Sequence, residues 1–157
     1  MSGRSVTMQE AKASGDAAAR LRAAVNRISR RLRPTKAGAG YTPTEISVLE
    51  TVAKRGPIRL SDLASLEGMN PTMLSRVARK LEAPGLIRRH PHPVDRRAAL
   101  LDITPSGRRL FEKVRSERTD QLSLELEALD PEERRLVIDA LPVLERLAER
   151  LRARSSS

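Results

Sequence analysis

The amino-acid sequence predicts a mainly α-helical fold that contains one small β-hairpin. Apolar residues recur with helical spacing in several segments, and two short apolar stretches flank a loop that contains two prolines. The chain has 157 residues, which suits one domain or one compact domain with an oligomerisation extension.

The composition is strongly basic. Lys and Arg number 30 and Asp and Glu 20, so the net charge is +10 and the sequence pI is about 11.2. A basic intracellular protein most often has a polyanion as partner, usually nucleic acid. The positive excess lies in the first two thirds of the chain, with +7 over residues 1–40 and +6 over residues 54–97, whereas residues 98–157 are nearly balanced.

The scarce residue types exclude several classes of protein. The chain has no Cys, which excludes a disulfide scaffold, a thiolate metal site and a thiol-based redox sensor. Tyr41 and Phe111 are its only aromatic residues, which argues against RNA binding on a platform of rings. No apolar run is long enough to span a membrane, and MSGRSVTMQE is no signal sequence, so we expect a cytoplasmic protein without cofactors.

The first forty residues predict a tail and one helix. Residues 1–15 show no sustained period and are expected to form a flexible tail. Residues 16–40 hold a helix whose single apolar stripe consists of Leu21, Val25, Ile28 and Leu32. Six Arg residues occupy its other faces, and they either contact DNA or only solubilise the helix.

The next segments predict two helices and a short strand. Thr42, Pro43 and Glu45 form a capping box at the start of a helix that ends before Gly56-Pro57. Residues 58–59 can pair as an edge strand, and residues 61–67 form a helix of about two turns.

A helix-turn-helix and a wing follow. Asn70 and Pro71 begin a helix that buries Leu74, Val77, Ala78 and Leu81 and exposes polar and cationic residues. Residues 86–89 and 98–103 read as strands around the loop 90–97, whose prolines cannot continue a ladder. Residues 41–104 therefore predict a winged helix-turn-helix domain.

The last third predicts two helices with apolar stripes. Thr104-Pro105 and Asp130-Pro131 each begin a helix, and together these helices cover residues 105–152, followed by a flexible tail at 153–157. In the last helix Val137, Leu141, Leu144, Ala148 and Leu151 follow the spacing of a coiled-coil seam. A winged helix of about 60 residues cannot cover all these stripes, so either a partner subunit covers them or the helices pack on one another within one chain.

The order of elements and three groups of residues resemble the MarR family of winged-helix transcription regulators over roughly residues 16–152. The first group is Gly56-Pro57-Ile58 with Leu63-Ala64, and the second is Ser75-Arg76-Val77 with Leu81-Glu82 and residues 85–89. The third is residues 93–97 with residues 103–107. Arg59 and Met73 stand where the family often has Thr, and aromatic residues of the family's ligand pocket are nearly absent.

This resemblance implies an obligate homodimer that binds double-stranded DNA. Two recognition helices about one DNA turn apart, roughly 34 Å, match an inverted-repeat operator. The most plausible regulator of this kind is a repressor, and the alternative is a sequence-tolerant architectural DNA-binding protein. An enzyme is disfavoured, because no catalytic set of residues and no phosphate-binding Gly loop is visible.

The candidate DNA contacts lie in the recognition helix and the wing. Arg76 could contact guanine with two hydrogen bonds or clamp a phosphate, and Asp95 is expected to orient Arg97 for the minor groove. His90 and His92 could in principle hold a metal ion, but without Cys they are better explained as loop residues near phosphates. The full set of candidates is Asn70, Thr72, Met73, Ser75, Arg76, Arg79, Lys80, His92, Asp95, Arg96 and Arg97.

Many relatives bind small phenolic or other aromatic anions between the dimer helices and the winged helix. The resemblance therefore implies a small aromatic or anionic effector in this chain, whereas a constitutive DNA binder without an effector is the alternative. The candidate lining residues are Arg27, Tyr41, Ile46 and Phe111.

Overall fold

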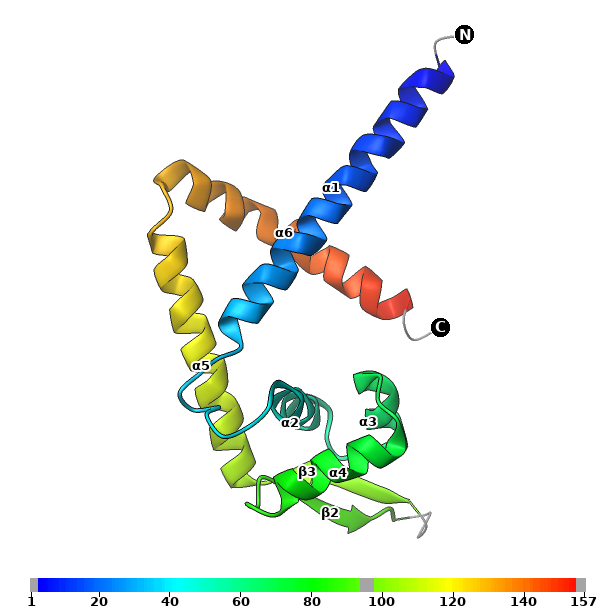
Figure 1. Cartoon of the computed structure of the whole chain (residues 1–157), viewed down its shortest axis with the longest axis vertical. Coiled ribbons are helices and arrows are strands. Elements are labelled where there is room, and N and C mark those ends of the chain that lie inside the picture. Colours follow the sequence, from blue (N-terminus) through cyan, green and yellow to red (C-terminus); the bar gives the residue numbers. More distant parts are fainter. Residues whose placement is uncertain (1–2, 94–97, 155–157) are drawn as a thin grey trace. The chain divides into compact units, whose positions relative to one another are not determined.

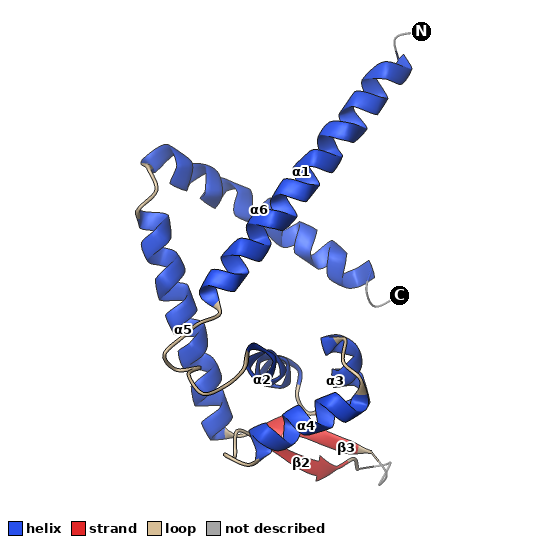
Figure 2. Ribbon diagram, viewed as in Figure 1, coloured by secondary structure: helices blue, strands red, loops and turns tan. Residues whose placement is uncertain are grey.

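The computed structural model describes residues 3–93 and 98–154. Figure 1 shows the order of the helices and strands along the chain, and Figure 2 distinguishes helices from strands. The elements are α1 (Gly3–Leu32), α2 (Pro43–Arg55), β1 (Ile58–Arg59), α3 (Leu60–Glu67), α4 (Pro71–Glu82), β2 (Ile87–Pro91), β3 (Ala99–Ile103), α5 (Pro105–Glu127) and α6 (Pro131–Arg154). The mainly helical winged-helix fold predicted from the sequence is thereby confirmed.

The N-terminal helix is longer than the sequence predicts. Residues 1–15 were expected to form a flexible tail, but the chain is helical from Gly3 onward. The segment 8–14 is rich in residues with high helix propensity, and such residues extend a helix without any apolar stripe. Periodicity alone therefore placed the start of this helix too late.

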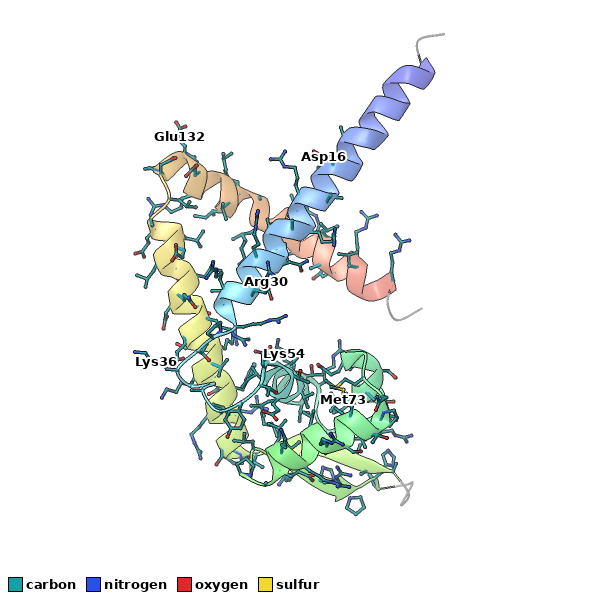
Figure 3. The ribbon with its side chains drawn as sticks, viewed as in Figure 1. Asp16, Arg30, Lys36, Lys54, Met73 and Glu132 are labelled. Carbon is teal, nitrogen blue, oxygen red and sulfur yellow. The ribbon has the colours of Figure 1, made fainter. Side chains whose placement is uncertain are left out.

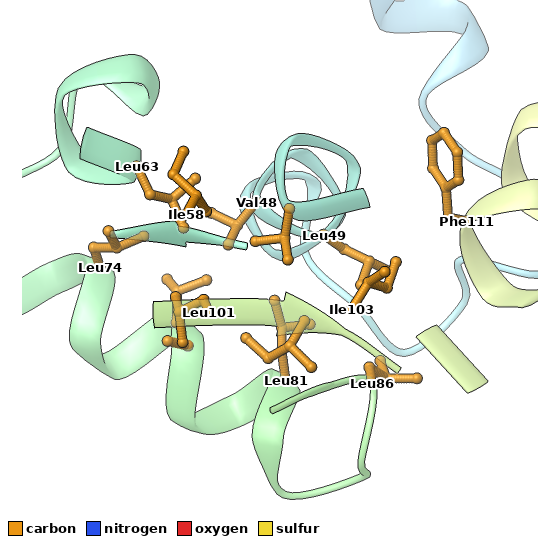
Figure 4. Packing of buried hydrophobic residues seen from close by; sticks show 14 of the residues in the cluster. Val48, Leu49, Ile58, Leu63, Leu74, Leu81, Leu86, Leu101, Ile103 and Phe111 are labelled. Atoms are coloured by element: carbon orange, nitrogen blue, oxygen red, sulfur yellow. The ribbon is translucent and has the colours of Figure 1, made fainter. Parts of the chain in front are cut away.

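The winged helix is built around one apolar core. Its fully buried side chains come from α2, α3, α4, β2 and β3, and include Leu49, Leu63, Leu74, Leu81 and Leu101. Figure 4 shows these side chains converging between the helices and the sheet. The spacing of the buried positions in α2 and α4 is that of one helical face, as the sequence predicts.

Side-chain caps define where the helices of this domain begin. The Thr42 hydroxyl accepts from the Glu45 N–H at 3.2 Å, and Glu45 Oε2 accepts from the Thr42 N–H at 2.8 Å, which completes the predicted capping box. Asn70 Oδ1 accepts from the Met73 N–H at 2.8 Å and caps α4. By contrast, α3 begins after Arg59 without a side-chain cap.

The three strands form an antiparallel sheet in the order β1-β3-β2. Ile58 of β1 pairs with Leu101, and Ile87 of β2 pairs with Ile103 at the open end of the hairpin. These paired residues belong to the apolar core. The exit of the hairpin packs closely on its entrance, because a Cβ at Gly107 would lie 1.9 Å from the Leu86 carbonyl oxygen. Only glycine fits at this point, where the Thr104 hydroxyl accepts from the Gly107 N–H at 3.1 Å.

The chain divides into two compact units, residues 1–118 and 119–157. The predicted domain boundary at residue 104 thus lies earlier than this division. The first half of α5 belongs to the unit of the winged helix because Phe111 and Val114 are buried there. None of the helices over the described residues combines the length and apolar character needed to cross a bilayer.

Candidate nucleic-acid interface

Helix α4 separates its side chains into a buried and an exposed face. Leu74, Val77, Ala78 and Leu81 are buried against the core. Thr72, Met73, Arg76, Arg79 and Lys80 are exposed, and Ser75 is half-buried. The packing of the apolar face therefore fixes which residues α4 presents outward, and Figure 3 locates Met73 in the first turn of this helix.

The first turn of α4 is also the part best suited to meet an anionic surface. Its first turn contains no acidic residue, and its N–H groups carry the positive end of the helix dipole. Asn70 holds one of these N–H groups and defines the start of the helix. The structure therefore assigns Asn70 a capping contact.

The three cations of α4 have different surroundings. Lys80 Nζ lies 3.2 Å from Glu45 Oε1, and this ion pair joins α4 to α2. The N–H of Thr42 donates to the Glu45 carboxylate and, with Lys80, holds its pKa below the usual value. Arg76 and Arg79 form no ion pair with the side chains that the structure describes, so their charge is free for a partner.

The loop end of the hairpin brings His92, a predicted DNA contact, beside Arg59, which the sequence did not single out for DNA binding. His92 Nε2 lies 3.1 Å from Arg59 Nη2, and because Arg only donates, this ring nitrogen accepts. The His92 N–H donates to the Ala98 carbonyl at 3.0 Å and continues the hairpin past the strand ends. The candidates Asp95, Arg96 and Arg97 lie outside the described residues.

Two further arginines of the hairpin are held by carboxylates. Arg88 Nη2 lies 2.7 Å from Asp102 Oδ2, and Arg89 Nε lies 3.3 Å from Glu82 Oε1. These pairs neutralise much of the charge on β2. Among the residues with described side chains, the unpaired cations of the helix-turn-helix therefore centre on α4.

The four predicted effector residues do not line one site. Ile46 and Phe111 are buried, and half-buried Tyr41 packs against the core that contains Phe111. Lys54 Nζ lies 6.0 Å from the centre of the Phe111 ring, which further occupies this side chain. Arg27 is exposed on α1, where it lines a surface groove together with other residues of that helix and Arg33 just after it.

A cavity of about 680 Å³ opens instead between α1, α2 and the end of α3. We call it the α1–α2 cavity. Its apolar lining comprises Val25, Ile28, Leu32, Pro43 and Met69. Its polar and charged lining comprises Ser29, Arg33, Thr44, Ser47, Glu50, Glu67 and Arg118.

Two carboxylates of the α1–α2 cavity are held in different ways. Glu50 forms an ion pair with Arg118, which joins α2 to α5. Glu67 accepts from the hydroxyl of Ser47 at 2.8 Å and from that of Thr51 at 2.5 Å, and thereby joins α3 to α2. Glu50 is thus neutralised by a cation, whereas Glu67 is held by neutral donors.

These residues escaped the sequence analysis because no local pattern links them. Glu50 and Arg118 are 68 positions apart, and Ser47 and Glu67 are 20 apart on different helices.

Over the residues that are described, no group of three His, Asp or Glu side chains could hold a metal ion.

Comparisons with known proteins agree with this architecture. The model of the MarR family matches residues 41–99. An HTH-type transcriptional regulator of Mycobacterium bovis is 31% identical over 121 residues, which are 77% of this chain and 85% of that protein. The HTH-type transcriptional repressor MdtR of Bacillus subtilis is 30% identical over 110 residues, 70% of this chain and 69% of the relative.

A solved structure extends the similarity to the helices outside the matched segment. The crystal structure of a transcriptional regulator from Pseudomonas aeruginosa has a TM-score of 0.76 and 33% sequence identity. The similarity covers 88% of this chain and 96% of that one.

Proposed function

Because this chain belongs to the MarR family of DNA-binding transcriptional regulators, we propose that it is a homodimeric repressor of an inverted-repeat operator, released by a small molecule. The family consists of regulators rather than enzymes. A repressor is favoured because the relative MdtR is named as one. Since such a protein acts on the chromosome, we place it in the cytoplasm.

The observation that carries this proposal is the outward face of α4. Thr72, Met73 and Arg76 are exposed on a helix whose opposite face is anchored in the core. Side chains at the start of such a helix reach base edges in the major groove, and cations further along it meet phosphates. Thr72, Met73, Ser75 and Arg76 are thus our base-reading set, with Arg79 and Lys80 nearer to the backbone.

The homodimer is supported by apolar side chains that this chain leaves uncovered. Leu21 of α1 is 36% exposed, and α6 exposes Leu136, Ile138 and Val143 by 53–70%. Exposed apolar surface on this scale marks an interaction site. A second copy of the chain is the partner that would place two α4 helices on one operator.

Competition binding tests sequence specificity directly. Labelled DNA from the chain's own promoter region is titrated with the protein, and unlabelled competitor is either the same DNA or a shuffled duplex of equal composition. A specific repressor prefers its own site by about 10³-fold or more. Equal competition by both duplexes would support the architectural alternative.

The variant Arg76→Ala then separates the two roles open to this side chain. If Arg76 reads guanine, binding weakens mainly on the native site and discrimination at one base pair is lost. If it clamps a phosphate, binding weakens uniformly and the salt slope falls by about 1. Arg150→Ala is the matched control, since Arg150 is an exposed cation on α6.

The wing is tested by Arg97→Ala. We expect operator affinity to fall at least about tenfold, because an Arg in the minor groove gains from its negative potential. The dimer and its thermal unfolding should not change. Unaltered affinity in a gel-shift titration would remove Arg97 from the interface.

An effector site is supported by the α1–α2 cavity. Its volume of about 680 Å³ lies within the range of known ligand pockets, which is about 300–1,000 Å³. It also adjoins the end of α3, the helix that precedes the recognition helix.

A further inference from the structure

We propose that the α1–α2 cavity binds an amphipathic amine, whose apolar body packs on α1 and whose protonated nitrogen pairs with Glu67. This inference rests on the proposed function only in taking the cavity as the effector site. It changes the expected class of effector from a small aromatic or anionic molecule to a cation.

The apolar part of the ligand is defined by the wall on α1. Val25 and Ile28 are 54% and 50% exposed, and they face the cavity together with Leu32 and Met69. Covering such side chains removes apolar area from water and favours binding. The lining contains no aromatic residue, so it favours a body that needs apolar contact without ring stacking.

The charge at the α3 end of the cavity is negative. Glu67 is the last residue of α3, and the C-terminus of a helix carries partial negative charge of its own. The two donors on this carboxylate, Ser47 and Thr51, are neutral hydroxyls and leave its charge in place. Each carboxylate oxygen retains acceptor capacity, so a protonated nitrogen can add a charge-assisted hydrogen bond.

The remaining charges of the lining do not offset this preference. Arg118 is engaged by Glu50, and this pair contributes no net charge. Arg33 is exposed to water, where its charge is hydrated and screened. Glu67 is half-buried and fixed by its two hydroxyl donors, so it is the charge best prepared to select a ligand.

The same contact connects the ligand to DNA binding. Glu67 joins α3 to α2, and only Gly68, Met69 and Asn70 separate it from the start of α4. A protonated amine on Glu67 shares the carboxylate with Ser47 and Thr51, and this strong charged donor weakens the two hydroxyl contacts that form the junction. The amine therefore prefers a state in which α3 and α4 are less firmly held, and it lowers operator affinity.

The test uses three probes with one saturated apolar body: cyclohexylpropylamine, cyclohexylpropanol and cyclohexylpropanoate. Binding to the full-length protein without DNA is measured by calorimetry near pH 7. We expect the amine to bind at least about tenfold more tightly than the alcohol, and the carboxylate to bind weakest. The order carboxylate, alcohol, amine would overturn the proposal, as would the absence of binding by all three.

The variant Glu67→Gln shows whether the preference comes from this residue. Its amide oxygen can still accept from a hydroxyl, but its charge is gone. We expect the amine to lose about tenfold in affinity while the alcohol is unchanged. Glu112→Gln, an exposed carboxylate on α5, is the control and should change neither.

An operator titration with and without amine completes the experiment. We expect saturating amine to raise the operator Kd about tenfold for the unaltered chain and not for Glu67→Gln. Amine binding without an effect on operator affinity would overturn the connection to DNA. Because ligand binding is measured without DNA, a failure to bind any operator would count against the proposed function alone.

Discussion

The winged helix and the last helix differ in how far their apolar side chains are exposed. In the winged helix Leu49, Leu63 and Leu74 are at most 1% exposed, and they lie in a single core formed by one chain. In α6 Leu136 is 70% exposed and Leu151 59%, and over its described side chains α6 buries none. The two regions have similar apolar patterning, yet only the winged helix forms a core among its own elements.

This difference shows that amphipathic spacing predicts that a face will be covered but does not identify what covers it. The apolar face of α4 is covered by elements that are near it in the sequence. Helices α2 and α3 precede α4, the hairpin follows it, and all of them share its core. In α6 no side chain that the structure describes is buried. The winged helix is therefore expected to depend on its own packing, and α6 on association.

The first prediction concerns the substitution Leu74→Ala in the core of the winged helix. We expect a loss of about 2–5 kcal/mol in the free energy of unfolding, since Leu74 is fully buried and its removal leaves a cavity. Chemical denaturation measures it. Leu66→Ala is the control, because Leu66 is 50% exposed on neighbouring α3 and should cost less than about 1 kcal/mol. Equal losses at both positions would contradict a single core.

The second prediction concerns the substitution Leu144→Asp on the apolar seam of α6. A carboxylate in an apolar subunit interface should raise the dimer dissociation constant about 100-fold or more, while the circular dichroism of the helices persists. Analytical ultracentrifugation measures the constant. Glu145→Gln on the adjacent exposed position is the control. Unchanged association of Leu144→Asp would favour packing of these helices within one chain.

The sequence predicts the winged helix well because its cues are local. Thr42 and Asn70 cap their helices through contacts three residues along the chain. Such signals need no knowledge of distant parts of the chain. The outward face of α4 follows from them, since the buried face excludes every other orientation.

The rest was less predictable because it depends on distant contacts or on propensity without pattern. The start of α1 lacks periodicity and was assigned too late. Phe111 and Tyr41 are proposed as ligand contacts from the position of the family's ligand crevice, and the structure shows that they also pack with the core, a distant contact that the sequence does not indicate. Glu67 drew no attention, since its role arises only when α2 and α3 meet.

The third prediction tests the junction of α2 and α4 through pH. Glu45 has a lowered pKa in the folded chain, so its contribution is present above its ordinary value of 4.5 and is lost as the pH falls through the folded value. Glu45→Gln should therefore lower the free energy of unfolding by about 1 kcal/mol at pH 7. The gap between variant and parent should shrink as the pH falls below 4.5 and through the lowered folded pKa of Glu45.

Urea denaturation at a series of pH values measures that gap. Asp62→Asn is the control, since Asp62 is exposed and pairs only with Ser61 in the described contacts. A gap that stays constant from neutral to acid pH would mean that the charge of Glu45 does not contribute. In that case the ion pair with Glu45 would not restrain Lys80, and Lys80 would be fully available to DNA.

The smallest expected effect concerns the ion pair of Arg88 and Asp102 at the surface of the hairpin. The Arg88 side chain is 65% exposed, so water and salt screen the pair despite its distance of 2.7 Å. Asp102 also accepts from the Ile103 N–H at 2.9 Å, a contact that does not need Arg88. We therefore expect Arg88→Gln to change the free energy of unfolding by less than about 1 kcal/mol.

Thermal denaturation at low and at high salt measures this change. If the pair is only a surface contact, the small difference between parent and variant disappears at about 1 M salt, where the Debye length falls to about 3 Å. A larger, salt-independent loss would mean that Arg88 supports the hairpin through packing of its stem. The winged helix would then depend on its rim as well as on its core.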